Sequence, residues 1–202
     1  MKFALIFAAL AALSGCSAVS ALTGSDALDV YELRAEDQPQ IARQSPDQVI
    51  IETPSATGAL NTDRIMIKPN TLQAQYLPGA RWSDEAPVML QTLMLRSVQS
   101  TDAFSYVGRQ PLGARGDYAV LTELVDFQTE LDATGETATV RLGMTVRVLR
   151  EDDNRIIASR NFAASAIAPT TETLALVAGF DAAAKNLLDA FTSWTLSVIA
   201  AN

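Results

Sequence analysis

The stretch 138-ATVRLGMTVRV-148 alternates between two kinds of side chain along its whole length. The odd-numbered residues are threonine, arginine or glycine, and the even-numbered residues are all apolar: Ala138, Val140, Leu142, Met144, Val146 and Val148. Because successive side chains of a β-strand point to opposite faces of a sheet, this period of two predicts a strand with one buried and one solvated face. We therefore expect a sheet that is covered on one side only.

Further strands are predicted on both sides of this stretch. Residues 118–127 form a comparable apolar-rich run, joined to it through the turn-forming sequence Asp-Ala-Thr-Gly at 132–135. Residues 155–166 follow the charged turn 151–154, so the three segments together predict an antiparallel meander. Shorter strands are expected at 30–33, 49–51, 64–68, 72–77 and 104–107, with 64–68 and 72–77 paired as a hairpin.

Two helices are expected. The sequence 83-SDEAP-87 combines a Ser or Asp cap, acidic residues and an early proline, which predicts a helix from Asp84 to Ser100. A longer helix is predicted from Leu174 onward, because apolar residues recur there at steps of three or four up to Val198. Its opposite face carries the polar stripe Asp181, Lys185 and Asp189. These charges argue against a membrane-spanning helix and favour packing across the sheet, with an amphipathic membrane-surface helix as the minor alternative.

These patterns together predict an α+β fold. We expect a single two-layer domain, in which a mixed, mainly antiparallel sheet with a three-strand meander is packed by two helices, including the long C-terminal one. A length of 202 residues suits one domain of this kind.

The N-terminus has the layout of a secretory signal peptide. Lys2 is followed by an uncharged run from Phe3 to Leu13, which is well short of the ~20 residues that a transmembrane helix needs. The next residues are Ser-Gly-Cys, and Cys16 is the only cysteine of the sequence. A core cysteine near an ordinary cleavage site is one interpretation of this pattern.

The other interpretation rests on a resemblance, since 13-LSGC-16 resembles the lipobox of bacterial lipoproteins. The resemblance implies cleavage before Cys16, acylation of its sulfur and of the new amine, and, with Ser17 next, export to the outer membrane. We therefore expect a signal peptide at 1–15, a lipidated N-terminus and flexible tether at 16–28, and the domain at 29–202. One acyl chain binds membranes only marginally, so two or three chains make a durable anchor.

Composition argues against several functions. The sequence contains no histidine, so nucleophile triads and metal sites that depend on histidine cannot form, and no P-loop or nucleophile-elbow motif occurs. Removal of residues 1–15, which contain one lysine, changes the net charge from −8 to −9, against nucleic-acid binding. We expect no catalytic residue, metal or cofactor. The rival hypothesis is an enzyme that uses carboxylates on envelope glycans, which would require two acids converging in a cleft.

Residues 60–95, LNTDRIMIKPNTLQAQYLPGARWSDEAPVMLQTLML, carry a second resemblance. Together with the lipobox, 31-YEL-33, 160-RNF-162 and the closing Ala-rich helix with Trp194, they resemble the ABC-type transport auxiliary lipoproteins. These are the PqiC-like partners of mammalian-cell-entry (MCE) lipid-transport systems. The chain departs from the family pattern at Leu77, where a second tyrosine is expected beside Tyr76.

The resemblance implies a non-enzymatic lipoprotein on the periplasmic face of the outer membrane. Its partner would be an MCE-domain tunnel protein, with an ABC permease and ATPase as indirect partners, and lipids would pass between the membranes. A tunnel-forming partner is compatible with a homo-oligomer of this chain. The alternative is a structural or assembly-scaffold lipoprotein without a transport role.

Three residues of the resembling segment are candidates for partner contact: Arg81, Trp82 and Tyr76. Tryptophan and arginine are over-represented at interface hot spots. A competing interpretation, which we favour, packs Trp82 at a loop-to-helix junction, with Arg81 covering it or pairing with Asp84. Tyr76 and Trp194 are likewise expected to be core or half-buried rings.

Overall fold

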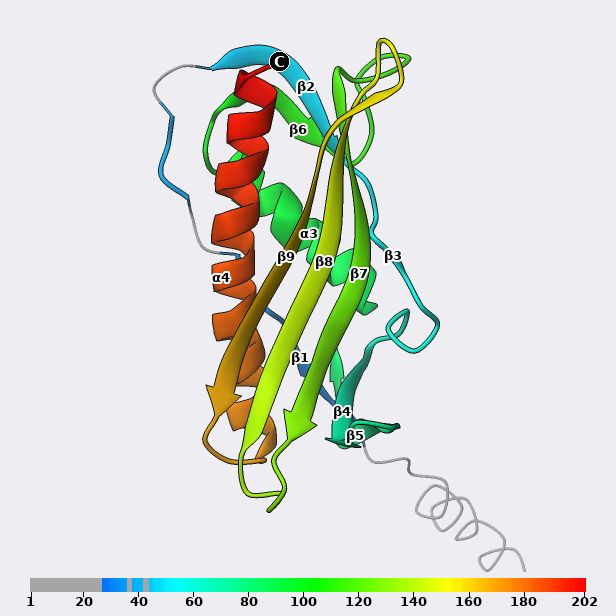
Figure 1. Ribbon diagram of the computed structural model, residues 1–202, viewed down its shortest axis with the longest axis vertical. Coiled ribbons are helices and arrows are strands. Elements are labelled where there is room, and N and C mark those ends of the chain that lie inside the picture. Colours follow the sequence, from blue (N-terminus) through cyan, green and yellow to red (C-terminus); the bar gives the residue numbers. More distant parts are fainter. Residues whose placement is uncertain (1–26, 36–37, 42–43) are drawn as a thin grey trace, which may run out of the picture.

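The three longest strands are those that the sequence marks most clearly. The computed structural model describes residues 27–35, 38–41 and 44–202, so Cys16 and the expected signal peptide lie outside the described residues (Figure 1). Strands β7 (Tyr118–Leu131), β8 (Ala138–Arg150) and β9 (Arg155–Ala168) form the predicted antiparallel meander. All six even-numbered residues of 138–148 are buried, which confirms the one-sided alternation.

Six shorter strands complete a mixed sheet around β7. They are β1 (Asp29–Tyr31), β2 (Ser45–Ile51), β3 (Ser55–Ala56), β4 (Arg64–Asn70), β5 (Gln73–Trp82) and β6 (Phe104–Gly108). The predicted hairpin is β4–β5, while β2, β3 and β4 each run parallel to β7 and pair with different parts of it. Each parallel ladder joins at most four residue pairs, whereas the two meander ladders join nearly whole strands, so pairing is mainly antiparallel.

Two helices, α3 (Ala86–Gln99) and α4 (Thr173–Ala200), cover one face of the sheet (Figure 1). Helix α4 packs along β8 and β9 and also contacts α3. The first helix starts later than predicted, because Glu85 occupies the N-cap position without a side-chain capping bond and Asp84 lies before the helix. Within the described part of the chain, neither helix has the combination of length and apolarity that a membrane span requires.

Aromatic side chains join α4 to the sheet. Phe180 of α4 lies 5.0 Å from Trp82 of β5 and 5.3 Å from Phe127 of β7, measured between ring centres. Farther along the helix, Trp194 contacts Phe162 of β9 at 5.4 Å. The Trp82–Phe180 and Phe162–Trp194 pairs are edge to face, and such pairs contribute about 0.5–1.5 kcal/mol each beyond their buried area. The helix is therefore fixed to the sheet along most of its length.

The segment before α3 differs from the prediction. Residues 80–82 do not form a loop, since β5 continues through Pro78 and Gly79 to Trp82 and pairs there with β1. Gly79 has a φ of +72°, a conformation that glycine adopts without steric cost, so the strand passes through this point without ending. Trp82 is thus the last residue of a strand.

Candidate functional site

Two of the three candidate contact residues, Tyr76 and Arg81 of the β4–β5 hairpin, are partly accessible to solvent. Tyr76 is half-buried, as predicted; its hydroxyl donates a hydrogen bond to the carbonyl oxygen of Ala59 at 3.1 Å. The guanidinium carbon of Arg64 lies 4.6 Å from the centre of the Tyr76 ring, within the range of a cation–π interaction. The exposed guanidinium of Arg64 therefore stacks on the Tyr76 ring.

Arg81 pairs with a different acid from the one predicted. Its Nη1 lies 3.3 Å from Oδ2 of Asp63, and it also donates to the carbonyl oxygen of Trp82 at 3.3 Å. The predicted partner, Asp84, lies beyond the end of β5, whereas Asp63 directly precedes the strand that pairs with Arg81. Both side chains are more than one-third exposed, so this ion pair is open to solvent.

Trp82 has no exposed surface. Its ring packs edge to face against Phe127 and Phe180, in line with the packing interpretation of the sequence. Any effect of this ring on a partner would have to pass through its neighbour Arg81. A partner contact at Arg81 or Tyr76 stays a prediction.

A second candidate region lies where the segment after β1 crosses α4. We call residues 32–41, of which 36 and 37 are not described, the strap. The backbone N–H of Arg34 donates to Oδ1 of Asp181 at 3.1 Å, and its Nη2 donates to Oδ2 at 2.5 Å. Gln38 donates to Oδ1 of Asp189 at 2.7 Å. The polar stripe of α4 therefore binds the strap, a contact that the sequence pattern of the helix alone does not predict.

Electrostatics agree with this contact. The hydrogen bond to the Asp181 carboxylate, together with its negative charge, raises the pKa of Arg34 above its already high ordinary value. The Arg34 side chain is 81% exposed, so water screens much of this attraction. The pair therefore positions the strap more than it stabilises the domain.

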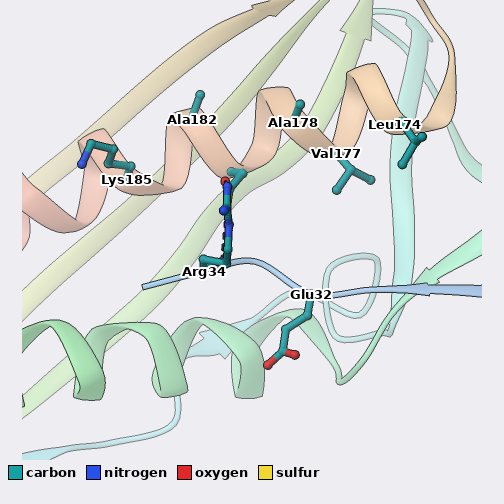
Figure 2. A pocket seen from close by; sticks show the side chains of 8 residues that line it. Glu32, Arg34, Leu174, Val177, Ala178, Ala182 and Lys185 are labelled. Atoms are coloured by element: carbon teal, nitrogen blue, oxygen red, sulfur yellow. Dashed lines mark hydrogen bonds and ion pairs between the residues drawn. The ribbon is translucent and has the colours of Figure 1, made fainter. Parts of the chain in front are cut away.

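A groove with a volume of about 500 Å³ lies between the strap and the outer face of α4 (Figure 2). One wall is a largely apolar strip of the helix, and the strap forms the other: the lining residues are Glu32, Arg34, Leu174, Val177, Ala178, Asp181, Ala182 and Lys185. Figure 2 shows the side chain of Arg34 reaching toward α4, where it donates to Asp181, while the carboxylate of Glu32 points away from the helix. The two acids of the groove do not converge as a carboxylate-dependent hydrolase would need.

Among residues 27–35, 38–41 and 44–202, no group of three or more Asp, Glu, His or Cys side chains is placed to hold a metal ion. What the described surface offers is an open ion pair, a stacked tyrosine and an apolar groove, all of which suit binding.

Comparison with known proteins identifies the family. The family model for the ABC-type transport auxiliary lipoprotein component matches residues 31–191. The chain belongs to this family. The match begins in β1 and ends in α4, so it includes the β4–β5 hairpin, the strap and the meander of this auxiliary lipoprotein.

Individual relatives extend the comparison. An uncharacterized protein of Bradyrhizobium diazoefficiens is 28% identical over 174 residues, which are 84% of this chain and 45% of that protein. The auxiliary lipoprotein thus spans less than half the length of this relative. A Xanthomonas campestris protein of the DUF330 family model, with a solved crystal structure, is 24% identical to this chain. The two structures superpose with a TM-score of 0.76 over 84% of this chain and 96% of that one.

A more distant structure shares the same architecture. The structure of a hypothetical protein from Chlamydia trachomatis is 12% identical with a TM-score of 0.53, over 77% of this chain and 99% of that one. At such identities these structures establish the fold alone.

Proposed function

We propose that this protein is a non-enzymatic auxiliary subunit of an ABC transporter of the MCE type, which moves lipids across the periplasm. The observation that carries the proposal is the family match over residues 31–191, which assigns the domain to the auxiliary components of ABC-type transport.

The proposal includes a lipid anchor at Cys16. Cleavage after residue 15 would leave this cysteine as the first residue, and acylation there would hold the domain on the periplasmic face of the outer membrane. Acylation of both the sulfur and the new amine would supply the two or more chains that a durable anchor needs. Cys16→Ser is expected to give a soluble or uncleaved protein that does not support transport.

The partner contact is proposed on the β4–β5 hairpin, around Arg81 and Tyr76. Both residues combine a fixed geometry with an exposed polar group, because Arg81 is held by Asp63 and Tyr76 by Ala59. A side chain that is already ordered loses less entropy when a partner binds. The proposed partner is an MCE-domain protein, through which the ABC permease and ATPase are reached.

Affinity purification of the tagged, membrane-extracted protein tests this function. Mass spectrometry of the bound material should recover an MCE-domain protein and its ABC subunits, and Arg81→Ala should reduce that recovery. Arg141→Ala is the matched control, because Arg141 also forms an exposed ion pair on the sheet, with Glu130 at 2.6 Å. Recovery of no transporter subunit, even after crosslinking, would refute the transport role and leave a scaffold.

A further inference from the structure

Three turns lie together at one end of the domain, where the chain enters it. Strand β4 runs parallel to β7, so the turn 71–72 that follows β4 lies at the same end as the turn 132–137 that follows β7. Ala138 at the start of β8 pairs with Ala168 at the end of β9, so the segment 169–172 lies at this end as well. Strand β1 runs parallel to β5, which starts at this end, so residues 27–28 approach from the same side. We call this the tether end; it is the lower end of the molecule in Figure 1.

The opposite end is formed by loops 109–117 and 151–154, which we call the distal end. The backbone N–H of Glu151 donates to the carbonyl oxygen of Asp117 at 2.9 Å, so the two loops are in contact. They lie near the C-terminus at the upper end of Figure 1. Nearly whole strands of the meander separate the two ends.

The most exposed large apolar side chains are concentrated at the tether end. In the described part of the chain, four such side chains are more than two-thirds exposed: Leu72 at 96%, Ile167 at 77%, Leu112 at 71% and Leu174 at 70%. Leu72 is at the tip of the β4–β5 hairpin, Ile167 is near the end of β9, and Leu174 is in the first turn of α4. Of these four, Leu112 alone belongs to the distal end.

The arrangement fits a flat apolar surface better than a peptide. The three tether-end residues project from three separate elements around the rim of the domain, so they line no common groove. Single exposed apolar side chains are common on protein surfaces. What distinguishes these is that three of the four most exposed ones in the described residues share the end from which the chain enters the domain. Their neighbours include the acidic residues Asp132, Glu136 and Glu172, which disfavours an anionic lipid surface and leaves a zwitterionic one.

The length of the preceding chain makes such contact possible. Ala27, the first described residue, lies eleven positions after Cys16, and at ~3.3 Å per residue this stretch reaches at most about 36 Å. A lipid anchor at Cys16 therefore keeps the tether end within this distance of the bilayer. Confinement at such range raises the effective concentration of a weak second contact.

We propose that the tether end rests on a zwitterionic bilayer through Leu72, Ile167 and Leu174. The inference depends on the anchor at Cys16, which is part of the proposed function. The domain then stands upright on the membrane and turns its distal end toward the periplasm. The three contacts are auxiliary to the acyl chains, because three partly inserted side chains are too few to hold the domain alone.

Variants that carry one reactive thiol each test the proposed membrane contact. Because acylation blocks Cys16, the only native cysteine, Leu72→Cys, Leu174→Cys or Leu112→Cys introduces one reactive thiol into the full lipidated chain. Each variant is labelled with a polarity-sensitive fluorophore and reconstituted into vesicles of phosphatidylcholine and phosphatidylethanolamine. All three positions are highly exposed, so we expect the substitutions to leave folding unchanged.

At positions 72 and 174 we expect a blue-shifted emission and at least a twofold loss of quenching by aqueous iodide, with no change at position 112. Equal quenching at all three positions on vesicle-bound protein would overturn the inference, as would stronger protection at position 112. Protection that appears only after an MCE-domain protein is added would overturn the lipid contact and assign the end to a protein partner.

Flotation and the mass of the Cys16 peptide separate this inference from the proposed function. A chain that floats with vesicles and carries acyl groups, but shows no protection at position 72, retains the anchor and refutes the membrane contact. A chain without acyl groups refutes the anchor, and the membrane contact with it.

Discussion

Substitution of Trp82 by alanine separates the two roles that the sequence allows for this residue. The ring is fully buried and contacts Phe127 at 5.8 Å and Phe180 at 5.0 Å between ring centres, so it connects β5, β7 and α4. If packing is its role, truncation opens a cavity at the point where the helix meets the sheet. If partner contact is its role, the domain should keep its stability and lose only its partner.

The structure gives the expected magnitude. Truncation of a buried tryptophan costs about 3–5 kcal/mol, and two aromatic pairs are lost here, so we expect a value near 5 kcal/mol. Typical domains unfold with about 5–15 kcal/mol, so Trp82→Ala should consume a large share of the total. With an m-value of about 1–3 kcal/mol per molar urea, the unfolding midpoint should fall by more than about 1 M.

Urea unfolding followed by far-ultraviolet circular dichroism measures this effect without relying on tryptophan fluorescence. Arg81→Ala is the neighbouring control: its ion pair with Asp63 is half-exposed and is worth at most about 1 kcal/mol. A Trp82→Ala protein with an unchanged midpoint and impaired partner recovery would refute the packing argument. A large loss of stability in Arg81→Ala would show that the Arg81–Asp63 pair contributes more than an exposed ion pair does.

Three further substitutions probe other parts of the structure. The hydrogen bond from Arg150 lowers the pKa of Asp153 to about 2, below the unfolded value of about 3.9. The stability that this carboxylate contributes is therefore complete above the unfolded pKa and is lost as the pH falls through the folded pKa of about 2. Asp153→Asn should lower the urea midpoint at about pH 5 and have little effect near the folded pKa. Asp181→Asn weakens the contact with Arg34 and should speed amide hydrogen exchange at Arg34 by up to about fivefold, with a midpoint change that corresponds to less than about 1 kcal/mol. Alanine favours a helix over glycine by about 1 kcal/mol, but Gly179→Ala should still destabilise the domain, because the new Cβ would lie 2.8 Å from Cγ2 of Val140. In a Val140→Ala background the same substitution should stabilise the domain, as measured by the urea midpoint.

The meander was predictable because one physical constraint acts on every residue of it. A strand with one covered face must alternate, and the sequence from Ala138 to Val148 does so at every position. Helix α4 was predictable for the same reason, since its apolar spacing of three and four residues records a single covered face. The pairing partners of the short strands carry no such periodic signal, so the parallel pairing of β4 with β7 emerged only from the structure.

The strap was not predictable, because its contacts depend on a match between two distant segments. Arg34 binds Asp181 and Gln38 binds Asp189, two acids that are eight helical positions and about 12 Å apart at ~1.5 Å per residue. Neither segment reveals this match on its own. The error over Arg81 has a similar origin: Asp84 is near in sequence, while Asp63 is near across the hairpin.

The dimensions of α4 and β9 fit the proposed role as an anchored auxiliary subunit. Helix α4 has 28 residues and is about 42 Å long at 1.5 Å per residue, and β9 has 14 residues and is about 46 Å long at 3.3 Å per residue. Because the lengths match, one helix covers the meander from the tether end to the distal end, with Phe180 and Phe191 packed at successive positions. A domain built in this way is a stiff spacer. If the tether end rests on the membrane, the distal end stands about 40 Å above it, where a periplasm-spanning partner can be reached without a longer tether.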